Sequence, residues 1–385
     1  MKIIGILKTA LLSMVVACSL WSCSGNNNEK PRYVAVRLSG EEKWSLLDTN
    51  SGDILCENEF EEEPSAVCDN MFVVRGKNGY YECYKVDDSK NVVSEGKYTQ
   101  LGTFGSDGVT FAVKEGKTIT IIDKDFDEVK VLSDKITQTA NFSDGLAAFC
   151  KDGHWGFLDT KGDEVIPARY DGVAQFREGL AYVQQGDKIS VINKKGEAIK
   201  TFSSTKYSVL SPIYANGYSV VLKGDKVVFI DKEGEESFSN PKLEPSYCYM
   251  INDGITVFAK DGEYGLMNTD GEVLVQPKYA SIYHASTNRY IACNDNNRYG
   301  IIDTEGKTVL AFDYKGIVQC SESADHYFAF DGKTWTLIDE EGKELGKKSF
   351  SDVNFAVTPF LHFYSEANQH DDYAGIEDPD AEAVE

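Results

Sequence analysis

A short motif returns nine times along the chain and constrains the fold more than any other feature of the sequence. Its best-preserved copy is HWGFLD at 154–159, and related copies include KVVFID at 226–231 and RYGIID at 298–303. The Asp or Asn that ends each copy falls at positions 48, 87, 123, 159, 193, 231, 268, 303 and 339, so successive copies lie 34 to 39 residues apart. Such regular spacing indicates a tandem repeat protein, in which each repeat packs against its neighbours.

Each copy of the motif sits in the same local pattern. An apolar run such as LAAFCK at 146–151 precedes it, a tight turn joins the two, and a second turn leads to a third run such as DEVIP at 163–167. Short apolar runs separated by Gly-containing turns predict antiparallel strands. The 33 Gly, 21 Tyr and 20 Phe residues also fit a protein of strands and turns. The sequence therefore predicts an all-β fold.

The turn that follows the motif has a conformational explanation. Asp159 begins such a turn and Gly162 lies three residues later, and Asp303 and Gly306 repeat this spacing. The Asp carboxylate accepts hydrogen bonds from backbone N–H groups two residues on, and Gly supplies the left-handed residue that the turn needs. These turns are too short for a calcium loop of about twelve residues. No metal site and no cofactor are expected.

The motif is apolar on both faces of the predicted strand. Trp155 and Phe157 point to one face, whereas Gly156 and Leu158 point to the other. Sheets that are covered on both sides need this pattern, as in the blades of a propeller or in a stacked β-array. The Gly that follows the aromatic residue of the motif, at Gly156, Gly265 and Gly300, is expected to let a neighbouring sheet or aromatic ring approach closely.

These units resemble the WG repeat, named for its Trp-Gly pair, of bacterial lipoproteins. The stretch 146–180 is similar to the repeat almost from end to end, but only Trp155-Gly156 is a literal WG. Tyr264-Gly265 and Tyr299-Gly300 are near versions, and Thr follows Trp335 in the last unit. The resemblance implies an all-β repeat domain over residues 33–363 and implies no particular reaction.

The number of units bears on the architecture. Propellers typically have four to eight blades, and nine units exceed this range. We therefore predict a β-propeller of about eight blades, in which the first and last units share one blade. The alternative is an open, curved β-array whose imperfect end units act as caps.

The two ends of the chain differ from the repeat region. Residues 1–22 have Lys2 and Lys8 before an apolar run that is too short to span a bilayer, which predicts a secretory signal. Leu20-Trp21-Ser22-Cys23 resembles a lipobox, which implies a lipid on Cys23; Cys18 is the alternative site. Residues 23–32 are expected to form a flexible tether, and the acidic segment 364–385 a disordered tail.

Charge and cysteine content limit the classes of function. A net charge of −23 repels DNA, RNA and anionic headgroups, so no nucleic-acid partner is expected. Behind the signal and Cys23 the sequence has seven cysteines and no CxxC, and an odd number cannot all pair internally. Cys56 and Cys68 are a candidate pair. Five scattered His residues show no zinc-type spacing.

No catalytic signature is present, so the sequence predicts a binding protein rather than an enzyme. We expect a lipid-anchored scaffold of the cell envelope, on the outer membrane of a Gram-negative bacterium, with a protein or glycan partner. The alternative is a carbohydrate-binding protein or a glycoside hydrolase on a propeller. The residues that depart from the repeat phase are candidates for a binding surface on the loops; they are Tyr283, His284, Arg289, Tyr290, His326 and Tyr327.

Overall fold

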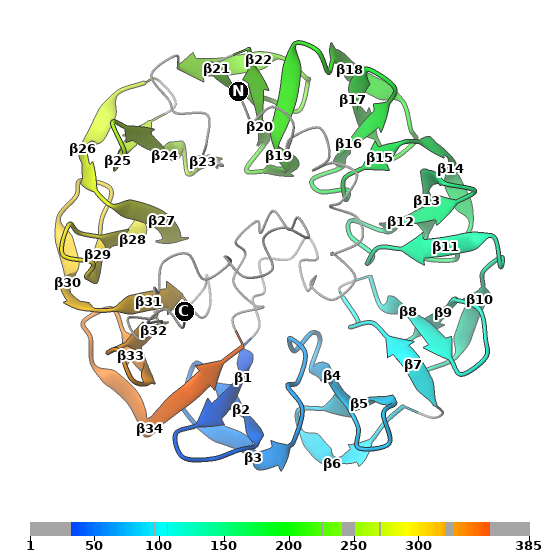
Figure 1. The fold of residues 1–385 in the computed structure, drawn as a ribbon, viewed down its shortest axis with the longest axis horizontal. Helices are drawn as coiled ribbons and strands as arrows, with labels where there is room; N and C mark the ends of the chain where they lie inside the picture. Colours follow the sequence, from blue (N-terminus) through cyan, green and yellow to red (C-terminus); the bar gives the residue numbers. More distant parts are fainter. Residues whose placement is uncertain are drawn as a thin grey trace, which may run out of the picture.

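The chain folds into a closed ring of small antiparallel sheets, which Figure 1 shows viewed down its shortest axis in a computed structural model. The structure describes residues 32–94, 97–105, 107–224, 226–240, 251–268, 271–319 and 326–354. The predicted signal, nearly all of the tether and the acidic tail therefore lie outside the described residues. The all-β prediction is confirmed, and no helix in the described ranges has the length and apolarity to cross a membrane.

The described ranges contain 34 strands. In the first part of the ring these are β1 (Tyr33–Leu38), β2 (Trp44–Asp48), β3 (Ile54–Phe60), β4 (Met71–Arg75), β5 (Tyr81–Lys85), β6 (Asp88–Val92), β7 (Tyr98–Leu101), β8 (Val109–Lys114), β9 (Thr120–Asp123), β10 (Glu128–Val131), β11 (Ile136–Thr139), β12 (Leu146–Lys151), β13 (His154–Asp159) and β14 (Glu164–Tyr170). The next strands are β15 (Gly172–Val173), β16 (Leu180–Gln185), β17 (Lys188–Asn193), β18 (Ala198–Ser203), β19 (Tyr207–Ala215), β20 (Tyr218–Lys223), β21 (Lys226–Ile230) and β22 (Glu236–Asn240). The last part contains β23 (Ile251–Asn252), β24 (Ile255–Lys260), β25 (Glu263–Asn268), β26 (Val273–Tyr279), β27 (Ser281–Ser286), β28 (Arg289–Cys293), β29 (Tyr299–Ile302), β30 (Thr308–Tyr314), β31 (Gly316–Gln319), β32 (His326–Phe330), β33 (Trp335–Asp339) and β34 (Glu344–Val353).

These strands form nine units around the ring. Five sheets have four strands each, and each of the two seven-stranded sheets joins two neighbouring units. We number the units in chain order: unit 1 is β1–β3, unit 2 is β4–β6, unit 3 is β7–β10, and units 4 to 9 begin at β11, β15, β19, β23, β27 and β31. In a complete unit the first strand lies toward the centre of the ring and the fourth at its outer edge (Figure 1). The closed ring is thus a propeller of nine units instead of the eight that we predicted.

The last strand explains why the first and last units do not merge. Unit 9 has its own four strands, and β34 pairs with β33 from Glu344 to Phe350. The same strand then pairs with β1, with Phe350 opposite Leu38 and Val353 opposite Val36. The end of β34 thereby supplies the first strand of unit 1, and the ring closes without sharing a blade.

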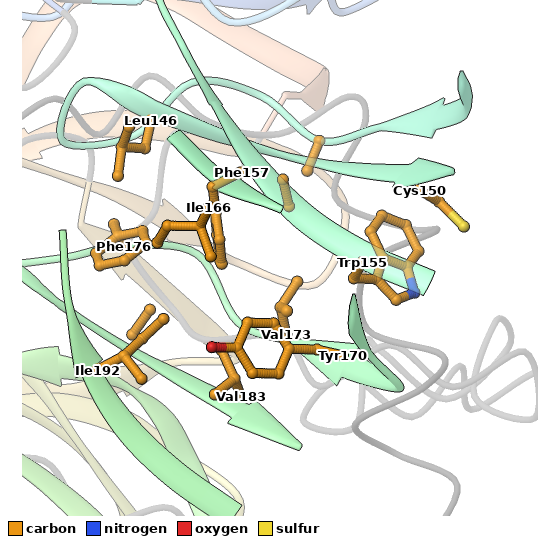
Figure 2. Packing of buried hydrophobic residues seen from close by; sticks show 13 residues of the cluster. Leu146, Cys150, Trp155, Phe157, Ile166, Tyr170, Val173, Phe176, Val183 and Ile192 are labelled. Atoms are coloured by element: carbon orange, nitrogen blue, oxygen red, sulfur yellow. The ribbon is translucent and has the colours of Figure 1, made fainter. Parts of the chain in front are cut away.

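Most of the apolar core lies between neighbouring units. Figure 2 shows one such cluster, in which Trp155 and Phe157 of β13 face Val183 and Ile192 of unit 5. The opposite face of the same strand carries Leu158, which packs in a second cluster against unit 3. Trp155, Phe157 and Leu158 are all at most 5% exposed. Both faces of the motif strand are therefore buried, as its sequence predicts.

The Gly of the WG pair makes room for the fourth strand of its own sheet. Trp155 pairs with Tyr170 and Phe157 with Ile166, so the residues between Ile166 and Tyr170 bulge over Gly156. A Cβ atom on Gly156 would lie 2.4 Å from the carbonyl oxygen of Ile166. The corresponding distances are 2.4 Å at Gly265 and 2.7 Å at Gly300. The close backbone belongs to the bulged strand of the same sheet, so the expectation of a neighbouring sheet is wrong. The expectation of an aromatic ring is confirmed at Gly300, where a Cβ atom would lie 2.9 Å from ring atoms of Phe312, and at Gly265, where it would lie 3.0 Å from a ring atom of Phe258.

The aromatic residue of the pair has a repeated partner. In six units the aromatic residue of the pair, or its equivalent, lies opposite an aromatic residue near the end of the fourth strand or the segment replacing it: Trp44–Phe60, Tyr81–Tyr98, Trp155–Tyr170, Tyr264–Tyr279, Tyr299–Tyr314 and Trp335–Phe350. Cross-strand aromatic pairs stabilise antiparallel sheets. In units 4, 7 and 8, which have both residues, the aromatic pair lies at the register shift and the Gly leaves room for the bulge.

The turns after the motif use backbone hydrogen bonds to the Asp carboxylate. Asp159 Oδ1 accepts hydrogen bonds from the backbone N–H groups of Lys161 and Asp163, at 2.9 Å each. Gly162 has a φ of +79° and donates its N–H to the carbonyl oxygen of Asp159. Asp303 accepts the same two bonds in unit 8. The carboxylates therefore close turns.

The cysteine prediction needs a correction. Cys68 is disulfide-bonded, whereas Cys56 is not part of a disulfide, so these two residues do not pair with each other. Cys150 and Cys293 are buried cysteines without a disulfide, near the end of β12 and at the end of β28.

Gly156→Val is expected to lower the free energy of unfolding by about 1–3 kcal/mol, because the new side chain overlaps the bulged backbone of β14. Urea unfolding followed by tryptophan fluorescence measures the change. Thr336→Val is the matched control: Thr336 has the same place in unit 9 but pairs regularly with Ser349. Equal unfolding midpoints for the two variants would contradict the close-approach role of Gly156.

Candidate functional site

The six residues predicted to line a loop surface do not form one cluster. Tyr283, His284, Arg289 and Tyr290 belong to β27 and β28 of unit 8, whereas His326 and Tyr327 begin β32 of unit 9. Tyr283 is 37% exposed, and the His284 ring lies edge-on to Tyr290 with 5.4 Å between centroids. Tyr290 and Tyr327 are 2% and 0% exposed, so their assignment to a surface is wrong. Both tyrosines occupy strand positions that point into the core, and burial raises the pKa of Tyr290.

Two residues of that set, Arg289 and His326, connect neighbouring units. Arg289 Nε donates to Glu340 Oε2 at 2.8 Å, in the turn between β33 and β34 of the next unit. His326 Nδ1 lies 2.8 Å from the carbonyl oxygen of Thr49, in the turn between β2 and β3 of unit 1. Both side chains stand where a second strand begins, and both reach the turn after the third strand of the following unit. Their contacts join neighbouring units of the ring.

The same contact recurs elsewhere with acidic residues. Asp144 accepts hydrogen bonds from Lys194 Nζ at 2.7 Å and from the backbone N–H of Gly179 at 2.6 Å. Glu178 accepts the corresponding bonds from Lys232 Nζ and the backbone of Gly217. Burial alone raises the pKa of Glu178, but these hydrogen bonds outweigh burial and hold its pKa below the ordinary value. Asp69 pairs with Lys124 in the same way between units 2 and 3.

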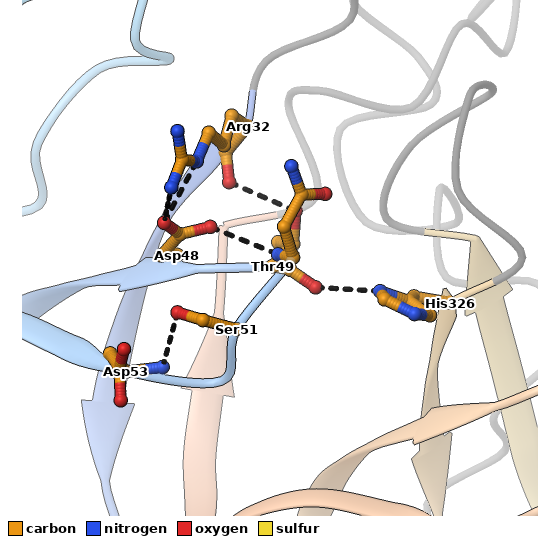
Figure 3. A network of polar contacts seen from close by, with 7 residues as sticks. Arg32, Asp48, Thr49, Ser51, Asp53 and His326 are labelled. Carbon is orange, nitrogen blue, oxygen red and sulfur yellow. Dashed lines mark hydrogen bonds and ion pairs between the residues drawn. The ribbon is translucent and has the colours of Figure 1, made fainter.

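The junction between unit 9 and unit 1 has a polar network of its own, which Figure 3 shows. Arg32 Nε donates to Asp48 Oδ2 at 2.8 Å, and Asp48 Oδ1 accepts a bond from the backbone of Asn50. Thr49 joins this network to His326 of unit 9 through its carbonyl oxygen. Burial raises the pKa of Asp48, but the bonds from Arg32 and the turn backbone bring it below its ordinary value.

An open groove lies between units 5 and 6 and is lined by residues 200–203 of β18, the following connector and parts of unit 6. Figure 1 shows β18 at the outer edge of the ring. Its volume is about 880 Å³, within the range of about 300–1,000 Å³ that is usual for small-molecule sites. Phe202 and Tyr207 form its apolar floor, with ring centroids 4.8 Å apart. Thr201, Ser203 and Thr205 also line it, and the hydroxyls of Ser203 and Thr205 are hydrogen-bonded to each other at 2.8 Å.

Charged side chains stand along this groove in pairs. Lys200 Nζ lies 2.9 Å from Glu235 Oε1, and Lys223 Nζ lies 2.6 Å from Glu236 Oε1. The hydroxyl of Tyr207 also donates to Glu236, at 3.0 Å. The hydrogen bond that Lys223 donates to Glu236 lowers the pKa of Glu236 and raises the pKa of Lys223. Both side chains are therefore charged at neutral pH.

The prediction from sequence did not include this groove. The sequence feature that could have indicated the groove is the connector between the fourth strand of one unit and the first strand of the next. This connector reads SDKI at 133–136, between units 3 and 4, and STKY at 204–207, between units 5 and 6. The exchange of Ile136 for Tyr207 distinguishes the two junctions, and an alignment of the units with one another reveals it. No cluster of three or more potential metal ligands occurs within the described ranges.

The ring and its repeated bulge define an all-β, propeller-like repeat protein. The sequence profile of the WG-containing repeat matches residues 155–188 and 264–297, so the chain carries WG repeats in units 4–5 and 7–8. No curated protein matches the chain in sequence.

Solved structures with similar folds share little sequence with this chain. The crystal structure of a eukaryotic initiation factor is 11% identical, with a TM-score of 0.50, and the match covers 85% of this chain and 97% of that one. BamB from Moraxella catarrhalis is 12% identical, covering 73% and 92% of the two chains with a TM-score of 0.41. The computationally designed Ika8 protein is 13% identical, covering 74% and 95%, with a TM-score of 0.40. At such identities the similarity concerns the fold alone.

Asp48→Asn is expected to lower the free energy of unfolding by about 1 kcal/mol at pH 7, because the charge-assisted bond from Arg32 is lost. The pKa of Asp48 is lowered by folding, so this stabilisation is present above the pKa of the unfolded chain and disappears as the pH falls through the folded pKa. Thermal unfolding of wild type and variant between pH 7 and pH 3 should show a difference that shrinks on acidification.

Asp303→Asn is the control for that measurement, because Asp303 closes the equivalent turn in unit 8 and has no ion pair within the described residues. Asn stands at this position in two other units, as Asn193 and Asn268, and serves as turn acceptor there. An Asp48→Asn difference that equals the Asp303→Asn difference, or that persists unchanged at pH 3, would show that the Arg32 pair adds no stability.

Proposed function

We propose that this protein is a lipid-anchored scaffold of the cell envelope that binds a protein or a glycan through its ring of WG repeats. The observation that carries the binding role is the ring itself: its repeated residues build the junctions between units, and the groove between units 5 and 6 leaves polar and aromatic groups open. A rigid ring of this kind presents a broad surface on which residues can differ from unit to unit without disturbing the junctions.

The anchoring part of the proposal rests on the sequence before the ring. A lipid on Cys23, the start of the segment that we interpret as a tether, would hold the domain at the outer membrane of a Gram-negative cell. Several acyl chains on one cysteine give stable attachment, since a single chain binds only marginally. The first strand begins at Tyr33, so nine residues separate it from this cysteine.

The groove favours binding over glycoside hydrolysis. A general acid needs a raised pKa so that it holds a proton at neutral pH. Hydrogen bonding to Lys223 lowers the pKa of Glu236, which is the opposite shift. We therefore propose a binding role without turnover and keep carbohydrate recognition, rather than cleavage, as the second candidate.

Cys23→Ser is expected to abolish membrane attachment. The wild-type chain, expressed in a Gram-negative host, should incorporate a labelled fatty acid and enter the detergent phase of a Triton X-114 separation. Cys18→Ser is the matched control and should behave as the wild type. Labelling of the Cys23→Ser variant, or loss of labelling in Cys18→Ser, would overturn the assignment of the lipid to Cys23.

The lipidated chain should retain a defined protein or glycan partner when it is solubilised from its native membranes. Affinity capture after mild cross-linking, followed by mass spectrometry and glycan analysis, measures this. A partner recovered in near-equal amount supports the scaffold role. Capture that yields no species above the level seen with an unrelated lipoprotein would remove the support for it.

A further inference from the structure

We propose that the groove between units 5 and 6 binds an acidic glycan, that is, a chain of sugars carrying carboxylate groups. This inference rests on the proposed binding function and gives it a place and a ligand class. The groove combines an apolar floor, hydroxyl groups and ammonium groups within one open concavity. Those three kinds of group match the C–H face, the hydroxyls and the carboxylate of a uronic acid.

Comparison among the units shows which interactions of the groove recur at other junctions and which residue occurs at this junction in place of the usual one. Lys130 approaches Asp163 between units 3 and 4, just as Lys200 approaches Glu235 between units 5 and 6. Lys151 pairs with Glu164 within unit 4 as Lys223 pairs with Glu236 in unit 6. These ion pairs recur, so they belong to the scaffold of the repeat and frame the groove.

Tyr207 is the residue that makes this junction different. It pairs with Lys223 at the start of unit 6, and Ile136 pairs with Lys151 at the start of unit 4. Ile136 is 7% exposed, and Tyr98 at the same position of unit 3 is 0% exposed. Tyr207 is half-buried and lines the groove, with its hydroxyl held by Glu236. The Lys223 ammonium lies over the ring, 5.6 Å from its centroid, and Phe202 packs beside the ring. The exposed part of the Tyr207 ring and its hydroxyl edge are therefore the groups that can contact a sugar.

Charge indicates the acidic class of sugar. Three lysines and two glutamates line the groove, and the two glutamates are engaged by Lys200 and Lys223. Lys206 is exposed and makes no ion pair with another described residue. The groove therefore carries a surplus of positive charge on a chain whose net charge is −23. A carboxylate is attracted there and repelled over most of the remaining surface.

The test uses the full chain in detergent and isothermal titration calorimetry at low salt. The probes are cellotriose and its C6-oxidised form, cellotriuronic acid, which differ only in their carboxylates. We expect the acidic probe to bind at least tenfold more tightly. Lys206→Gln should weaken that binding about tenfold, and Tyr207→Ile, which installs the residue of the equivalent junction, should reduce it to the level of the neutral probe.

Lys135→Gln is the matched control, since Lys135 occupies the same exposed connector position before Ile136 and should have no effect. Equal binding of the two sugars, an equal effect of Lys135→Gln and Lys206→Gln, or tighter binding of an acidic hexapeptide would overturn the proposal. A membrane partner that is captured equally well by Lys206→Gln would leave the scaffold role standing while placing its binding site outside the groove.

Discussion

The ring depends on one contact that recurs at the loop end of its units. A side chain at the start of a second strand reaches forward to the turn that follows the third strand of the next unit. Asp144 and Glu178 make this contact with lysines, Arg289 makes it with reversed charge to Glu340, and His326 makes it with a backbone carbonyl. Because the geometry persists while the chemistry changes, backbone placement determines the junction and the side chains adapt to it. The apolar clusters between units then bury both faces of each motif strand.

This arrangement separates the residues that build the ring from those that are free to recognise a ligand. The most repeated side chains close turns, fill the spaces between units or pair across strands. The groove between units 5 and 6 keeps the repeated ion pairs and adds Tyr207 to them, so a small departure from the repeat converts a structural junction into an open site. The site is held by strands from two units, which gives its groups fixed positions.

Much of the architecture could be predicted from the sequence, since the period, the strand pattern and the turn chemistry all repeat. The closing role of β34 could not, because its pairing with β1 joins residues more than 300 positions apart. The role of Gly156 could not be predicted either, because the bulge of β14 over this residue follows from the register of strand pairing and not from composition. Tyr290 and Tyr327 departed from the repeat phase in sequence, yet their strand positions turn them into the core. Predicting the groove would have required knowing which units are neighbours and which side chains at equivalent positions remain exposed.

The shared strand at the junction of units 9 and 1 also bears on the order of folding. Unit 1 is synthesised before the other units of the ring, yet its innermost strand comes from the end of β34, which runs to Val353. Until those residues emerge, the inner edge of β1 has unpaired backbone groups, which favour pairing with other chains. The ring is therefore completed only after β34 has been synthesised, and the inner edge of unit 1 stays unpaired until all the units between them have been made.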